Sequence, residues 1–239
     1  FFVQRTKNQY LVPQYPKGVL KPLPKFCFMR KFYFLFAAVL FASISFGQSA
    51  ANYTFSTETT GSLALDRNGA ATDMSTGTTT LLAGGNDDVA SSVVNIGFDF
   101  LFMGVNYTQF SASSNGYMRL GATAVTTTAA SQTGTATGAI ITAFGGDQAT
   151  VTAAGANSKV HYKLFGTAPN RVLVVEWANM KMNYSSYATA TAGNGTYQVL
   201  IYETTGIVDL KYGAMSVAAT FLTGPVIGFS AGTTAGAIG

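Results

Sequence analysis

The sequence has few of the residues on which many enzymes and metal proteins depend. Its 239 residues include one cysteine, one histidine and one tryptophan, and only 10% are charged. A single cysteine forms no disulfide within the chain and no thiolate metal shell. The lone histidine, His161, is weak support for a triad or a metal site, because both need further partners at set positions. Because it shares a strand face with Lys159 and Lys163, we expect its side chain to be solvated.

Residues 29–47 contain the three parts of a secretory signal peptide. A basic start, MRK, is followed by an apolar run at 32–42 and by a small-residue cleavage site at 45–47. Spanning a bilayer takes about 20 apolar residues, and this run is roughly half as long, so we expect cleavage and not a membrane anchor. Residues 1–28 carry no initiating Met, and we expect them to come from translation upstream of a start at Met29 or to be an unusual leader.

The formal net charge of +4 changes sign once the signal is set aside. Seven of the 14 basic residues lie at or before Lys31, whereas all ten acidic residues come later. From Gln48 onward the net charge is therefore −3, which removes the main argument for a nucleic-acid partner. Cys27 also precedes the signal, so a cysteine nucleophile is excluded from the exported chain. No cofactor motif is present, and a membrane is involved only during export.

Residues 48–239 are long enough for one domain and have the pattern of an all-β protein. No long stretch follows the 3.6-residue helical period between helix caps. In NIGFDFLFMG at 95–104, four large apolar residues alternate with other residues, as in a strand with one buried face. Asn115-Gly116 suits a tight hairpin turn between strands expected near 107–114 and 117–120.

Further strands are indicated along the second half of the chain. The pattern predicts them in SKVHYKLFG, in RVLVVEWANMKM, in the hairpin TYQVLIYETTGIVDLKYG with its turn at 204–206, and in GPVIGFSAG. RVLVVEWANMKM is apolar on both faces, which indicates a central strand. The low-complexity run at 121–138 is expected to be a long loop or a weak edge strand, and the segment at 187–195 another exposed loop. We predict a two-sheet antiparallel sandwich, jelly-roll-like in type.

Four segments in order carry a resemblance to a known type of domain: IGFDFLFMGVNYTQFSASSNGYMRLG, ITAFGGD, KVHYKLFGTAPNRVLVVEWANM and YQVLIYETTGIVDLKYG. The sequence from about 52 to 232 resembles the amino-terminal β-sandwich module of large secreted or surface proteins of Bacteroidetes, of the type IX secretion kind. It is more distantly similar to nidogen-type extracellular domains. The resemblance implies an amino-terminal fragment of a longer exported protein with downstream modules. One departure is Gly145-Gly146-Asp147, where such domains carry a tryptophan and acidic residues.

The sharpest catalytic candidates are Glu176 and Glu203, each near the end of an apolar strand run. Glycosidases use two carboxylates about 5 to 10 Å apart, and adjacent strands facing one way would meet that requirement. The alternative is that Glu203 opens a turn and Glu176 lies beside Trp177 with a lysine such as Lys181 as its partner. No glycosidase motif surrounds either residue, so we expect a protein that is not an enzyme.

Two other pairs of residues are candidate binding groups. Asp87 and Asp88 lie in a Gly-rich turn and offer oxygen ligands to a hard cation, although they lack the alternating ligand pattern. Tyr184 and Tyr187 offer aromatic faces to sugar rings, although tyrosine is also common on sheet surfaces. We expect a non-catalytic module with a binding, adhesion or architectural role, its partner a surface glycan or another extracellular protein. The alternative is a carbohydrate-active domain, either sugar-binding or hydrolytic.

Overall fold

The computed structural model describes residues 53–126, 138–153, 155–182, 193–216, 226–231 and 235–237. All of them belong to the compact unit formed by Gly47–Gly239. The expected leader at 1–28 and signal peptide at 29–47 lie outside the described residues, as do most of the two expected loops. Among the described residues, no helix is long and apolar enough to cross a membrane.

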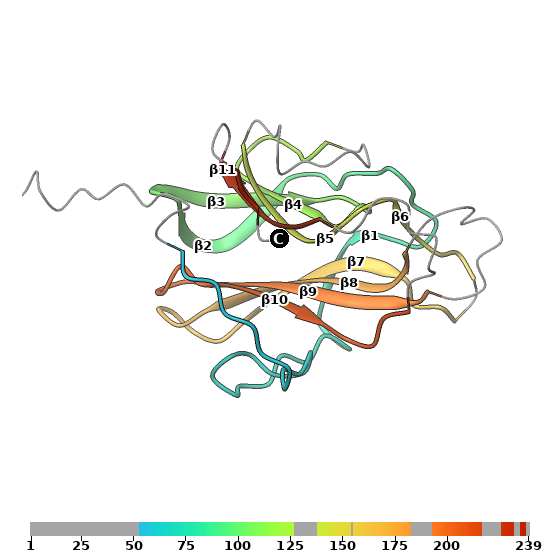
Figure 1. Ribbon diagram of the computed structural model, residues 1–239, viewed down its shortest axis with the longest axis horizontal. Helices are drawn as coiled ribbons and strands as arrows, with labels where there is room; N and C mark the ends of the chain where they lie inside the picture. Colours follow the sequence, from blue (N-terminus) through green and yellow to red (C-terminus); the bar gives the residue numbers. More distant parts are fainter. Residues whose placement is uncertain are drawn as a thin grey trace, which may run out of the picture. The chain divides into compact units, whose positions relative to one another are not determined.

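The domain is all-β, and its strands form two antiparallel sheets, which confirms the predicted sandwich. One sheet has the order β1-β7-β8-β9-β10 with β6 also paired to β8, and the other has the order β12-β11-β5-β4-β3-β2. Figure 1 shows the two sheets as two layers. The strands are β1 (Thr79–Leu82), β2 (Val94–Phe102), β3 (Val105–Ala112), β4 (Tyr117–Leu120), β5 (Ala139–Gly145), β6 (Gln148–Thr150), β7 (Lys159–Phe165), β8 (Val172–Met182), β9 (Gly195–Tyr202), β10 (Val208–Tyr212), β11 (Val226–Ala231) and β12 (Ala235–Ala237).

The core lies between the inner faces of the two sheets. Every second residue of β2 points into it, and the four predicted inward residues are all buried: Ile96, Phe98, Phe100 and Phe102. From the opposite sheet, Trp177 stacks on Tyr197 with ring centroids 5.2 Å apart. The indole N–H of Trp177 donates to the carbonyl of Ser113, 2.8 Å away, which ties the two sheets together. Full burial of a phenylalanine stabilises a fold by about 2 to 3 kcal/mol, so the alternation along β2 accounts for much of the stability of the sandwich.

The predicted hairpins are present. Gly116 has φ 82° between β3 and β4, and a Cβ there would lie 2.2 Å from the carbonyl oxygen of Phe144, so the turn requires glycine. Gly206 has φ 65° in the turn between β9 and β10. Strand β8 lies between β7 and β9, as its apolar sequence indicates. The sequence pattern does not predict β1, β5, β6 or β12: β1, β6 and β12 are short, and β5 is buried along its whole length and so shows no alternation.

A non-strand segment, residues 62–76, crosses the outer face of the sheet that contains β7, β8 and β9. We call it the strap. Figure 1 shows it in cyan, on the side of that sheet away from β2 and β3. The Lys163 ammonium donates to the carbonyls of Asp73 and Thr76 at 2.9 and 2.8 Å, and the backbone N–H of Arg67 donates to the hydroxyl of Tyr202 at 3.0 Å. The strap therefore covers a face that the sequence alone leaves open.

Candidate functional site

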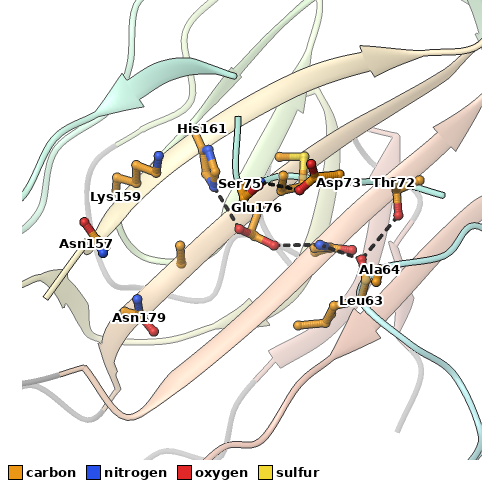
Figure 2. A pocket seen from close by; sticks show the side chains of 13 residues that line it. Leu63, Ala64, Thr72, Asp73, Ser75, Asn157, Lys159, His161, Glu176 and Asn179 are labelled. Atoms are coloured by element: carbon orange, nitrogen blue, oxygen red, sulfur yellow. Dashed lines mark hydrogen bonds and ion pairs between the residues drawn. The ribbon is translucent and has the colours of Figure 1, made fainter. Parts of the chain in front are cut away.

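Three polar side chains form a row across the outer face of the strap-bearing sheet. His161 of β7 lies opposite Glu176 of β8, which in turn lies opposite Gln198 of β9. The Nε2 atom of His161 is 2.8 Å from Glu176 Oε1, and Gln198 Nε2 donates to Glu176 Oε2 at 2.6 Å. Figure 2 shows the carboxylate held from both sides. We call these three residues the polar row.

The polar row is almost completely buried. His161 and Gln198 are each 1% exposed, and Glu176 is 9% exposed. Because the carboxylate accepts from His161, the imidazole carries a proton on Nε2. The amide nitrogen of Gln198 also donates to the carbonyl of Leu63 at 3.2 Å, which fixes the orientation of the amide. His161 Nδ1 and Gln198 Oε1 have no hydrogen-bond partner among the described residues.

A depression of about 480 Å³ opens over the polar row. Glu176 lies on its floor next to Ala178, whose small side chain leaves room, and Lys159 is the cross-strand neighbour of Ala178. The strap supplies one wall. In Figure 2, Lys159, Asn157 and Asn179 lie on one side of Glu176 and the strap residues on the other. The lining is made of Leu63, Ala64, Thr72, Asp73, Met74, Ser75, Asn157, Lys159, His161, Glu176, Ala178, Asn179 and Gln198.

The expectation that His161 is solvated is wrong. Its side chain does share a strand face with Lys159 and Lys163, as the alternation indicates. That face, however, is covered by the strap, and Lys163 itself anchors the strap through two backbone carbonyls. Strand alternation shows which residues share a face, but it does not show what a distant segment lays over that face.

The structure does not bring Glu176 and Glu203 together. Glu203 is paired with Arg171, whose Nε donates to Glu203 Oε2 at 2.8 Å and whose Nη2 donates to Oε1. The same guanidinium donates to the carbonyl of Gly97 in β2 at 2.6 Å, so this pair lies toward the opposite sheet, whereas Glu176 lies on the outer face. Along the strands the two positions are about five residues, or roughly 16 Å, apart. That geometry does not provide a glycosidase pair.

The environment of Glu203 is that of a structural ion pair. Hydrogen bonds from Arg171 hold the pKa of the Glu203 carboxyl below its ordinary value. The Arg171 guanidinium also lies 5.6 Å from the ring centroid of Phe98, in the other sheet. Glu203 therefore links the two sheets through Arg171 and does not line the depression.

The comparison with known families supplies the identity that the geometry alone leaves open. A family model described as NIDO related matches residues 52–237. The chain belongs to the NIDO-related family. This confirms the nidogen-like similarity carried by the strand and hairpin segments. Domains of this family are generally non-enzymatic and extracellular, and no catalytic family is indicated. No curated protein and no solved structure matched the chain.

In the NIDO-related domain, the Asp87-Asp88 turn is tied into the fold. Asp87 forms a β-bridge with Ala149, and Asp88, with φ 51°, accepts from the Asn115 amide at 2.7 Å. Burial, together with the charges of Asp87 and Asp88, raises the pKa of Asp147. Within the described residues, no group of three or more histidine, cysteine or acidic side chains is arranged to hold a metal ion.

The remaining sequence candidates, Tyr184 and Tyr187, lie outside the described residues of the NIDO-related domain. Sequence reasoning missed Gln198 and the strap. In the sequence, Gln198 stands out as a polar residue within the apolar run TYQVLIY, and Glu176 stands out in the same way within another apolar run. Cross-strand register, which a single sequence does not specify, is what joins the two.

Proposed function

We propose that the NIDO-related domain is an exported, non-catalytic binding module whose ligand occupies the depression over the polar row. The observation that carries the proposal is the burial of a hydrogen-bonded histidine, glutamate and glutamine on the outer face of a sheet. Replacing a buried ionic group by well-packed apolar residues is often neutral or stabilising, so stability alone gives little reason for such a row. Polar groups that converge on a concave site are the usual mark of a binding site.

A binding role fits the depression better than a hydrolytic one. The second acid in its lining, Asp73, accepts hydrogen bonds from Ser75, which lower the pKa of the Asp73 carboxyl. It is therefore ionised at neutral pH and is unsuited to protonate a leaving group. The Glu176 carboxylate, already hydrogen-bonded on both oxygens and surrounded by amides and a lysine, is arranged to bind a ligand.

The proposal includes the location of the protein. We propose that a signal peptide at 29–47 is cleaved during export. We further propose that the source is a bacterium of the Bacteroidetes type and that export uses type IX secretion. Amino-terminal sequencing of the secreted product tests the export step. We expect the product to begin at or near Gln48, and a product that begins at Phe1 would contradict the proposed export.

An array of surface glycans and extracellular proteins tests the binding role. We expect the purified chain to bind at least one component, and Glu176→Gln to lose that binding while Glu58→Gln keeps it. Glu58 is an exposed matched control that does not line the depression. Binding that survives in Glu176→Gln would remove the depression as the site. A chain that binds nothing on the array would contradict the binding role itself.

A further inference from the structure

We propose that the depression recognises a hydroxyl-rich ligand of the saccharide class, with Glu176 as the acceptor on its floor and Lys159 as a donor on its rim. The inference rests on the proposed binding function and names the class of ligand. It comes from the balance of hydrogen-bond donors and acceptors in the depression and from the charges placed around it.

The floor of the depression presents the Glu176 carboxylate as a hydrogen-bond acceptor. Both polar-row donors that face Glu176, the imidazole Nε2–H and the Gln198 amide, are already used on its two oxygens. Each carboxylate oxygen accepts more than one hydrogen bond, so capacity remains on Glu176. His161 Nδ1 and Gln198 Oε1 also lack partners among the described residues, but both atoms are buried, so Glu176 is the acceptor of the polar row that a ligand can reach. A ligand that fits this floor must bring donors.

The charged side chains in the lining of the depression favour a ligand with hydroxyl donors over one with ammonium donors. Lys159 lines the depression on the same strand face as His161, and no hydrogen bond or ion pair holds its ammonium within the described chain. A cation placed against Glu176 would be repelled by this lysine, which offsets part of the attraction of Glu176 and of Asp73, the other acid in the lining. A hydroxyl group avoids the conflict, because it donates to the carboxylate and accepts from the ammonium.

The fixed geometry of the carboxylate favours this kind of ligand. Hydrogen bonds from two neighbouring strands hold both oxygens of Glu176 before any ligand arrives, which lowers the ordering cost of binding. The side chains of Asn157 and Asn179 flank the same depression and add amide donors and acceptors. A volume of about 480 Å³ is within the range of small-molecule sites, which runs from roughly 300 to 1,000 Å³.

The test is calorimetric titration of the purified chain with two panels, neutral methyl glycosides and small primary amines, each at about 10 mM so that millimolar affinities are measurable. We expect saturable binding of a glycoside. Glu176→Gln is expected to weaken it by about tenfold to a hundredfold, because a hydrogen bond to a charged group is lost. Lys159→Met is expected to weaken it by about threefold to tenfold. Glu58→Gln and Lys181→Met are the matched controls and are expected to bind as the wild type does.

The outcomes distinguish this inference from the proposed function. Melting temperatures show whether Glu176→Gln remains folded; if it does not, Lys159→Met on the rim still decides the question. Binding of amines alone, strengthened in Lys159→Met, would overturn the hydroxyl inference and keep the binding function. Glycoside binding that is unchanged in both variants would also overturn it. Binding of neither panel, in a chain that still captures an array component through Glu176, would overturn the ligand class alone.

Discussion

The outer face of the strap-bearing sheet has two halves that are built from the same strands. In one half the outward residues of β8 and β9 are apolar and lie under Met74 of the strap: Val172, Val174, Leu200 and Tyr202. In the other half the same alternation presents the polar row, and the face opens as the depression. The covered half behaves as a second small core, whereas the polar half buries groups that are costly to desolvate, with the depression above them.

The difference shows that strand alternation determines which residues share this face but not whether their neighbours are apolar or polar. Val174 and Glu176 are two residues apart on one strand and point the same way, yet one packs against apolar neighbours and the other receives two hydrogen bonds. Apolar residues at 161, 176 and 198 together would extend the small core without a break. The change from apolar to polar at this point therefore divides a stabilising surface from a candidate binding surface.

The largest expected effect is on the covered half, through Met74→Ala. Met74 is 7% exposed and packs in the small core beneath the strap. We expect the free energy of unfolding to fall by about 3 kcal/mol, because removal of a buried methionine side chain leaves a cavity. Denaturant titration followed by circular dichroism measures the loss.

Leu65→Ala is the control for that change. Leu65 belongs to the same strap but is 42% exposed, so its truncation is expected to cost less than about 1 kcal/mol. Equal losses in the two variants would mean that the covered half is not a second core, and the contrast between the halves would disappear.

A smaller effect is expected when the polar row is replaced as a whole. Glu176→Leu alone leaves the donors of His161 and Gln198 unsatisfied and is expected to cost about 2 kcal/mol. Combined with His161→Leu and Gln198→Leu, it is expected to leave stability within about 1 kcal/mol of the wild type, or to raise it, because an apolar row suits the buried face. Thermal melting of the two variants makes the comparison. A triple variant that is less stable than the single one would show that the row is present for stability.

Much of the fold could be predicted from the sequence, because alternation and turn chemistry are local. The four inward residues of β2, the Asn115-Gly116 turn and the central place of β8 follow from patterns within a few residues. The candidate site could not be predicted in the same way. It depends on the register that sets Glu176 opposite both His161 and Gln198, and on a strap more than eighty residues away from them in the chain. Glu176 was singled out, but with Glu203 as its partner, because both acids follow apolar runs.

The finest contrast is between those two acids, and pH separates them. Arg171 lowers the pKa of Glu203 in the folded protein, so this ion pair contributes its full stability above the pKa of an unfolded glutamate and loses it as the pH falls through the lowered value. We therefore expect Glu203→Gln to melt at a lower temperature than the wild type at pH 7, and the gap to narrow below about pH 4.5. Melting curves across that range measure the gap, with Glu58→Gln as an exposed glutamate control whose gap is expected to stay near zero.

Because Glu203 joins the sheets far from the depression, Glu203→Gln should also leave ligand binding unchanged. A constant gap across pH, or a loss of binding, would mean that the two acids do not have the separate structural and binding roles assigned to them.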